Sequence, residues 1–166
     1  LGISFKALLL LGAKCTTFLF TKFLLPFHLS VFYPYTGEIA LLDFALPLVG
    51  LLALISLALV AYKKNWRVLW FGLAFYLLTL APSFFNLQKG NTVYIASDRY
   101  AYVPMIGLLL ILGWLVHRLA ASGKWSVVRA VLGIVLVATS LLSFVTARHW
   151  RDSYTLYSHV TTLYPN

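Results

Sequence analysis

The sequence predicts an all-helical integral membrane protein with about five transmembrane helices, and three observations support this fold class. Of the 166 residues, 61% are apolar, whereas about 45–50% are apolar in an average soluble domain. Only 10% are charged, against about 25% in soluble domains, so charged groups cannot cover the surface of a soluble fold. The apolar residues also gather in runs of about 20, the length that a helix needs to cross the hydrocarbon core.

This composition excludes a soluble globular enzyme, a disordered tail and a disulfide-stapled secreted domain. The net charge of +9 would suggest nucleic acid in a soluble chain. Here the basic residues stand between apolar runs, which is typical of membrane topology, so we expect no nucleic-acid partner. Cys15 is the single cysteine and allows no internal disulfide. No His, Cys, Asp or Glu cluster has metal-ligand spacing, so we expect no metal and no other cofactor.

Five candidate spans follow one another along the chain. The second is the cleanest, because the run from Phe44 to Tyr62 carries no charge. The third is short, and Pro82 near its end favours a tilt or a break. The first is interrupted by lysines; Lys14 near its middle marks either a polar cavity or contact with helices outside this chain. The predicted spans are 4–25, 43–62, 68–84, 103–121 and 127–147.

The basic residues of the connections predict the orientation. The connections at 63–67 and 118–129 hold six basic residues and no acid, whereas the others hold four acids and four bases. The positive-inside rule places the first two in the cytoplasm. We therefore expect a cytoplasmic N-terminus and an extracytoplasmic C-terminus, in the inner or plasma membrane if the protein is bacterial. Loops 26–42 and 85–102 then lie outside, and every acidic residue is on that outer face.

The loop before the fourth span carries the strongest candidate site. It places Asp98, Arg99, Tyr100 and Tyr102 within five residues at the membrane boundary. One interpretation is an aromatic belt followed by a helix start at Pro104. The other is a site for a lipid phosphate, which a guanidinium binds through two parallel hydrogen bonds. In that case Asp98 would hold Arg99 in place, and a tyrosine would add a donor.

The loop after the first span contains a weaker candidate. Pro26 and Pro34 block a continuous helix there, and the neighbouring aromatic residues suit an interfacial turn. His28 lies between the two prolines and could protonate a leaving group or coordinate a metal. A lone histidine with no Asp, Cys or second His nearby is more often structural.

The chain divides into a transmembrane region over 1–147 and an amphipathic segment over 148–166. In that segment Trp150, Tyr154 and Tyr157 recur at spacings of four and three residues, which is typical of one helix face. We expect a helix that lies along the membrane interface. Because the chain begins with leucine, we also expect it to be a piece of a longer polypeptide.

Three segments, in this order and spacing, resemble one protein family. They are Lys-Phe-Leu-Leu-Pro-Phe-His-Leu-Ser-Val-Phe-Tyr-Pro-Tyr at 22–35, Ser-Asp-Arg-Tyr-Ala-Tyr-Val-Pro-Met-Ile-Gly at 97–107 and Trp-Arg-Asp-Ser-Tyr-Thr-Leu-Tyr at 150–157. From about residue 14 onward the chain looks like the later membrane spans of the transmembrane and tetratricopeptide-repeat proteins. Eukaryotic members of that family are linked to protein O-mannosylation.

The resemblance implies that the chain belongs to a larger GT-C-like glycosyltransferase bundle followed by a soluble repeat region. Such enzymes transfer a sugar from a polyprenyl phosphate to an acceptor outside the cytoplasm. Their catalytic carboxylate lies in a first outer loop that nothing here matches, so no catalytic residue is expected in this chain. The implied partners are membrane lipid, a lipid-linked sugar and other membrane helices. Asp98, Arg99, Tyr100 and Tyr102, with His28, would lie near the donor phosphate.

A second function class stays open, namely a non-catalytic membrane subunit or scaffold of a larger complex. A transporter is disfavoured, because the sequence shows neither paired broken helices nor a repeated half. The upstream sequence would separate the first two classes. An acidic residue in a first outer loop favours the enzyme, whereas a native start near Leu1 favours the scaffold.

Overall fold

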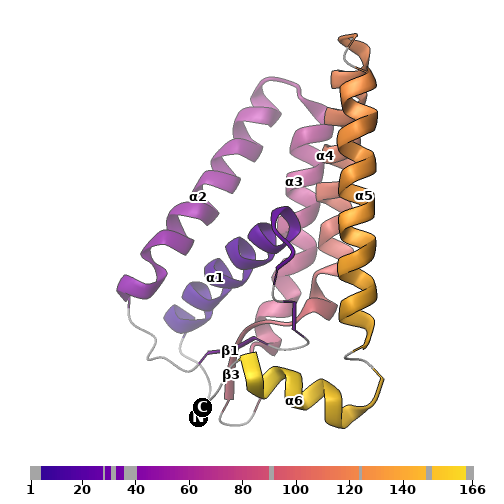
Figure 1. The fold of residues 1–166 in the computed structure, drawn as a ribbon. Coiled ribbons are helices and arrows are strands. Elements are labelled where there is room, and N and C mark those ends of the chain that lie inside the picture. Colours follow the sequence, from indigo (N-terminus) through magenta and orange to yellow (C-terminus); the bar gives the residue numbers. More distant parts are fainter. Residues whose placement is uncertain are drawn as a thin grey trace.

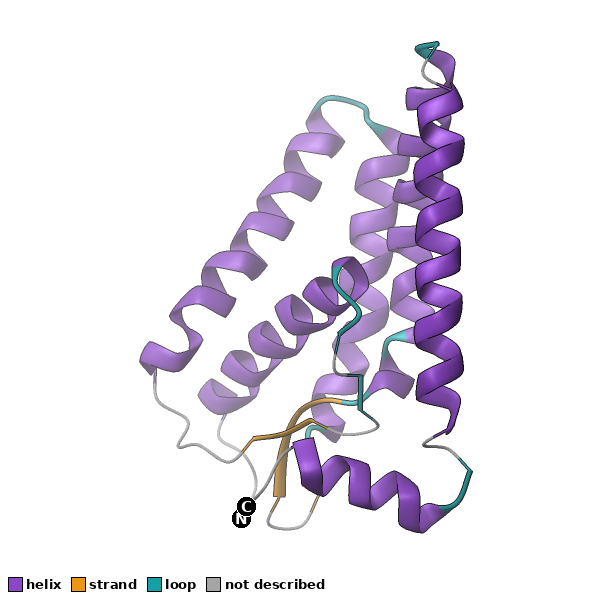
Figure 2. Cartoon of the chain, in the orientation of Figure 1, coloured by secondary structure: helices purple, strands orange, loops and turns teal. Residues whose placement is uncertain are grey.

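The computed structural model describes residues 5–27, 29–30, 33–35, 41–89, 92–123, 125–148 and 151–163. Helices dominate this part of the chain, with a few short strands at one end (Figures 1 and 2). With η for a 3-10 helix, the elements are α1 (Phe5–Leu24), β1 (Tyr33–Tyr35), α2 (Leu41–Lys63), α3 (Arg67–Leu80), η1 (Ala81–Asn86), β2 (Gln88–Lys89), β3 (Thr92–Ala96), η2 (Asp98–Tyr100), α4 (Tyr102–Ala121), α5 (Trp125–Ala147) and α6 (Ser153–Leu163).

Among the described residues, five helical segments are long and apolar enough to cross a membrane. The prediction of an all-helical integral membrane protein with about five spans is therefore confirmed. The segments are Phe5–Leu24, Asp43–Lys63, Arg67–Asn86, Tyr102–Ala121 and Trp125–Ala147, close to the predicted ranges. The third is interrupted as Pro82 predicts: the α-helix stops at Leu80 and continues as η1, because proline has no N–H for the helical ladder.

Helices α2 to α5 alternate in direction (Figure 1). The strands lie at one end of the bundle, where α2 and α4 begin and where α3 and α5 finish. We call this the sheet end. Helix α1 lies obliquely there, packed on α2, η1 and β3. It also reaches α3, where the buried Tyr76 hydroxyl donates a hydrogen bond of 2.6 Å to the carbonyl of Thr16. The oblique placement of α1 concentrates the protein's core at the sheet end.

Among the described helices, α3 and α4 make the most extensive contact. Gly72 and Gly107 face each other across this contact, and a Cβ added to Gly107 would lie 2.3 Å from the Gly72 carbonyl oxygen. Small residues allow two membrane helices to bring their backbones together in this way. The core continues from this contact to α1 and the strands, and its largest fully buried side chains include Tyr33, Tyr76, Phe44, Leu11, Leu19 and Leu80.

The two predicted outer loops form a small antiparallel sheet with the strand order β1-β3-β2, which the sequence analysis did not predict. Tyr33 pairs with Ala96, and Tyr35 pairs with Val93. The strands are too short for a clear alternating pattern, and Pro34 argues against a strand except at a sheet edge, where β1 lies. The pairing brings the segment after α1 against the segment before α4.

Beyond α5 the chain turns and α6 crosses the sheet end (Figure 1). Asp152 caps this helix, since its Oδ1 accepts a hydrogen bond of 2.7 Å from the backbone N–H of Thr155. Arg151 and Asp152 are exposed, and so is Tyr154. Trp150, which was predicted to share one helix face with Tyr154 and Tyr157, lies outside the described residues. The segment is thus a separate helix, and its position at a membrane interface stays a prediction.

Candidate functional site

An open cleft of about 560 Å³ lies at the sheet end, between the last turn of α1, the start of α4 and the last part of α5. Charged and polar groups line part of it, including Lys22, Asp98 and Tyr102. The remaining lining is mostly apolar and includes Phe23, Pro26, Leu29, Ala101, Met105 and Leu142. The cleft is therefore amphipathic, with two opposite charges beside a hydrocarbon-lined wall.

Asp98 is held by a chain of hydrogen bonds that starts in β1. The fully buried Tyr33 donates its hydroxyl proton to Asp98 Oδ1 at 2.9 Å and accepts a bond of 2.9 Å from the backbone N–H of Ser30. This contact follows from the strand register, because Tyr33 pairs with Ala96, two residues before Asp98. Burial raises the pKa of Asp98, while the Tyr33 hydrogen bond and the positive charge of Lys22 act in the opposite direction.

Lys22 supplies the positive charge of the cleft. Its ammonium donates to the backbone carbonyl of Phe27 and lies 5.2 Å from the ring centroid of Phe18 and 5.6 Å from that of Tyr33. These contacts hold the half-buried side chain beside Asp98. In the sequence Lys22 is one of the lysines that interrupt the first span, and no role at the site was predicted for it. The signal in the sequence was the position of Lys22 shortly before Pro26, a proline that cannot continue the helix.

Only part of the predicted phosphate site lines the cleft. Asp98 and Tyr102 do so, whereas Arg99 and Tyr100 do not. The exposed Arg99 donates from Nε to the Ser97 hydroxyl at 3.3 Å, and its guanidinium lies 5.7 Å from the ring centroid of Tyr100. Asp98 thus bonds to Tyr33 rather than holding Arg99 in place. The physical reason is the 3-10 turn, in which successive side chains point about 120° apart.

Helix α5 contributes a row of hydroxyl residues that the sequence analysis missed. Thr139, Ser143 and Thr146 all line the cleft, and their spacing puts them on one helix face. The hydroxyls of Thr139 and Thr146 each donate to a carbonyl of their own helix at 2.8 Å. Their oxygens can still accept a hydrogen bond from a ligand. This spacing of polar residues within an apolar span was the signal that could have identified them.

His28 lies outside the described residues, so its predicted role stays a prediction. Within the described ranges, no three His, Cys, Asp or Glu side chains come close enough together to hold a metal ion. The cleft combines a single carboxylate with an ammonium and hydroxyl groups. This set suits hydrogen bonding to an anionic or sugar-like ligand better than metal coordination.

Comparison with known proteins found no matching family model, no matching curated protein and no matching solved structure. The family resemblance therefore rests on the three sequence segments alone. Two of these segments, 22–35 and 97–107, meet in the structure through the Tyr33–Asp98 hydrogen bond. The pairing of β1 with β3, the strand directly before residue 97, brings them together.

Proposed function

We propose that the chain is the C-terminal membrane part of a glycosyltransferase that uses a polyprenyl-phosphate-linked sugar on the extracytoplasmic face of the membrane. The observation that carries this proposal is the amphipathic cleft at the sheet end. Its apolar lining suits a prenyl chain, and its ammonium and hydroxyl groups suit a phosphate and a sugar. Its volume of about 560 Å³ falls within the range of ligand sites, about 300–1,000 Å³.

In this proposal Lys22 and Tyr102 bind the donor phosphate inside the cleft. Lys22 is the cation that lines the cleft, and Tyr102 is 67% exposed, so its hydroxyl can reach a ligand. Asp98 lines the same cleft beside Lys22, and its Oδ1 is already engaged by the hydrogen bond from the Tyr33 hydroxyl. Arg99, on the same turn but outside the cleft lining, would meet the ligand at the mouth.

The charge distribution supports an extracytoplasmic position for the cleft. The described acidic residues Asp43, Asp98 and Asp152 all lie at the sheet end, at the starts of α2, α4 and α6. The opposite end carries the basic connections 63–67 and 118–129. By the positive-inside rule the opposite end would face the cytoplasm. Helix α1 also begins toward the sheet end (Figure 1), so this orientation of the cleft does not support the predicted cytoplasmic N-terminus, which stays a prediction.

Glycosyl transfer from a lipid phosphate needs a carboxylate that deprotonates the acceptor and a cation that stabilises the departing phosphate. In our proposal this chain supplies the cation. The carboxylate would come from the first outer loop found in members of the family. That loop precedes the later membrane spans that this chain resembles. The chain alone would then bind donor without transferring the sugar.

The test measures transfer from a defined polyprenyl-phosphate mannose by the detergent-solubilised full-length protein and its variants. Lys22→Ala is expected to lower transfer roughly 30- to 1,000-fold, because losing a charge-assisted bond to a buried phosphate costs about 2–4 kcal/mol. Lys22→Arg should retain part of the activity. Lys6→Ala removes an exposed lysine of the same helix and is the matched control.

Because Lys22 also bonds to the Phe27 carbonyl, thermal stability is measured in parallel. A variant that loses activity and stability together would make Lys22 structural and overturn its phosphate role. Arg99→Ala distinguishes the roles of the two cations. If the phosphate binds inside the cleft, this variant should lose less transfer activity than Lys22→Ala. Abolished transfer in Arg99→Ala with normal transfer in Lys22→Ala would move the phosphate out of the cleft.

A scaffold within a larger membrane complex is the second candidate, and helix α5 favours it. Val128 is the single buried residue of α5, so its large apolar side chains face outward along the helix. Such a surface suits either lipid or further membrane helices. Co-purification of a stoichiometric membrane partner, together with absent transfer by the full-length protein, would favour this function over the enzyme.

A further inference from the structure

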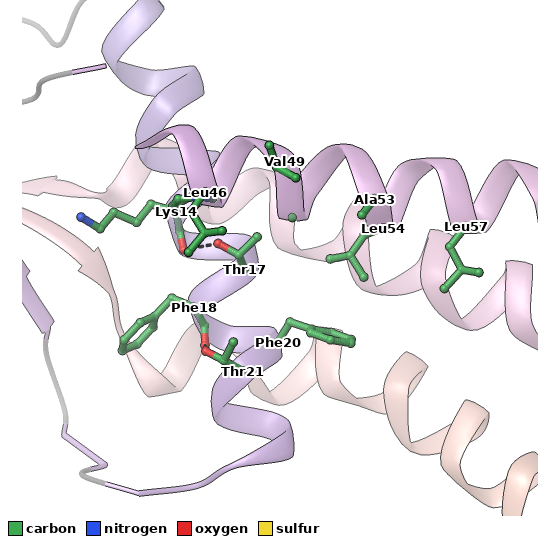
Figure 3. A pocket seen from close by; sticks show the side chains of 12 residues that line it. Lys14, Thr17, Phe18, Phe20, Thr21, Leu46, Val49, Ala53, Leu54 and Leu57 are labelled. Atoms are coloured by element: carbon green, nitrogen blue, oxygen red, sulfur yellow. Dashed lines mark hydrogen bonds between the residues drawn. The ribbon is translucent and has the colours of Figure 1, made fainter. Parts of the chain in front are cut away.

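A second hollow, separate from the cleft, lies between α1 and α2 (Figure 3). It is a groove of about 630 Å³. The hydroxyls of Thr17 and Thr21 face it but donate to carbonyls of their own helix, at 2.9 Å to Ala13 and 2.7 Å to Phe18. The walls are otherwise hydrocarbon and include Phe20, Leu46, Val49, Leu54 and Leu57. Only an apolar occupant suits the interior of this groove.

Lys14 stands at one end of the groove. Its carbon stem lines the groove, while its ammonium points away from the apolar side chains, and Leu57 lies at the far end (Figure 3). The ammonium is 4.4 Å from the ring centroid of Tyr35 and 4.9 Å from that of Phe44. In the part of the chain that the structure describes, no ion pair joins Lys14 to a carboxylate.

We propose that this groove binds one acyl chain of a membrane phospholipid, whose phosphate pairs with the ammonium of Lys14. A charge within a membrane span is costly, and two aromatic faces recover only part of that cost. Although Lys14 lies near the middle of α1, this oblique helix places its ammonium beside Phe44, at the start of α2. There a phospholipid phosphate at headgroup depth would supply the missing anion, and the acyl chain would fill the apolar groove. Asp43, which accepts a bond of 3.4 Å from the Tyr35 hydroxyl, lies at the same end and suits a headgroup that also carries an ammonium.

The dimensions favour a lipid chain over a further protein helix. Helices α1 and α2 touch beside the groove, where a Cβ added to Gly50 would lie 2.6 Å from Thr17 Cγ2. A helix about 10 Å in diameter would reach this groove of 630 Å³ only with the side chains of one face. An alkyl chain is far thinner and can follow the groove from Lys14 to Leu57. The inference does not depend on the proposed glycosyltransferase, because the groove and the cleft share no charged residue.

The test is native mass spectrometry of the purified chain titrated with palmitoyl-oleoyl phosphatidylethanolamine and with the diacylglycerol of the same chains. The wild type is expected to bind the phospholipid at least about tenfold more tightly, through the charge-assisted contact. Lys14→Met keeps the length of the side chain and should remove this difference. Ala53→Phe fills the groove and should abolish binding of both lipids. Lys6→Met, on the exposed part of the same helix, should bind like the wild type.

Two results would overturn the proposal. One is unchanged phospholipid binding by Lys14→Met, which would show that the ammonium contacts no phosphate. The other is a photo-cross-linking residue at the exposed Leu57 that labels a second protein instead of lipid in native membranes. The thermal stability of Ala53→Phe is measured as a control. A value close to that of the wild type would show that this variant loses lipid binding while it keeps its fold.

Discussion

Helices α1 and α5 are both long and apolar enough to span a membrane, but they lie in opposite environments. Of the five candidate spans, α1 has the lowest mean hydropathy and the largest share of buried residues. Helix α5 is among the most apolar, and Val128 is its single buried residue. In this chain, the high hydropathy of α5 therefore goes with a surface that faces lipid or further helices. Hydropathy does not identify the helix that packs inside the protein.

Residue size explains the difference. Helix α1 buries a run of small residues, and a Cβ added to Gly12 would lie 2.9 Å from the Phe84 ring. Small side chains allow close approach, which is the main source of attraction between helices in lipid. Helix α5 also contains a glycine, Gly133, but nothing lies within 4 Å of the Cβ position there. Its outward surface is made of branched apolar side chains, which suit contact with acyl chains.

The largest expected effect comes from truncating a buried leucine. Leu19 of α1 is 1% exposed, whereas Leu141 of α5 is 63% exposed. Leu19→Ala should lower the free energy of unfolding by about 2–5 kcal/mol, because it leaves a cavity in the core. Leu141→Ala should stay within about 0.5 kcal/mol of the wild type. Reversible unfolding in mixed micelles measures both variants, and equal losses would contradict the assignment of α1 to the core.

A smaller effect is expected at the α3–α4 contact. Gly107→Ala puts a methyl group 2.3 Å from the Gly72 carbonyl oxygen and 3.1 Å from the backbone nitrogen of Tyr76. Because backbone cannot move aside like a flexible side chain, the helices must separate, at a cost of about 1–3 kcal/mol. The control is Gly113→Ala in the same helix, where nothing lies within 4 Å of the new Cβ.

The unfolding midpoint in the same micelles checks this pair. Gly113→Ala should be neutral or slightly stabilising, since alanine favours a helix over glycine. If both variants lost stability equally, the effect would come from helix propensity or lipid contact, and the close approach of α3 and α4 would be refuted.

The smallest effect concerns α6, which makes few contacts with the other described elements. The hydrogen bond from the Thr155 backbone lowers the pKa of Asp152, so the folded helix favours the carboxylate. The capping stabilisation is therefore complete above the ordinary aspartate pKa of about 4 and is lost as the pH falls below it. Hydrogen exchange of the Thr155 amide should show this loss as the pH falls from about 4 through the lowered pKa of Asp152. Asp152→Ala should remove the pH dependence, and an unchanged dependence would contradict the capping role.

The sequence alone determined the membrane class, the five spans and the interruption at Pro82. These are local properties: a span is defined by the hydropathy of about 20 consecutive residues, and proline lacks its N–H wherever it stands. The segment over 97–107 was also identified from the sequence, because charged and aromatic residues are unusual at the start of a span. Asp98 and Tyr102 of that segment line the cleft.

The tertiary structure decided which residues share the site. The Tyr33–Asp98 hydrogen bond joins residues 65 positions apart, and it depends on a pairing between two short strands that no local pattern indicated. The position of Lys22 at the cleft depends on the oblique placement of α1, and the 3-10 turn directs Asp98 inward while Arg99 stays exposed. Hydropathy reports which segments enter the membrane, but helix tilt, strand register and side-chain direction arise only from packing between distant segments.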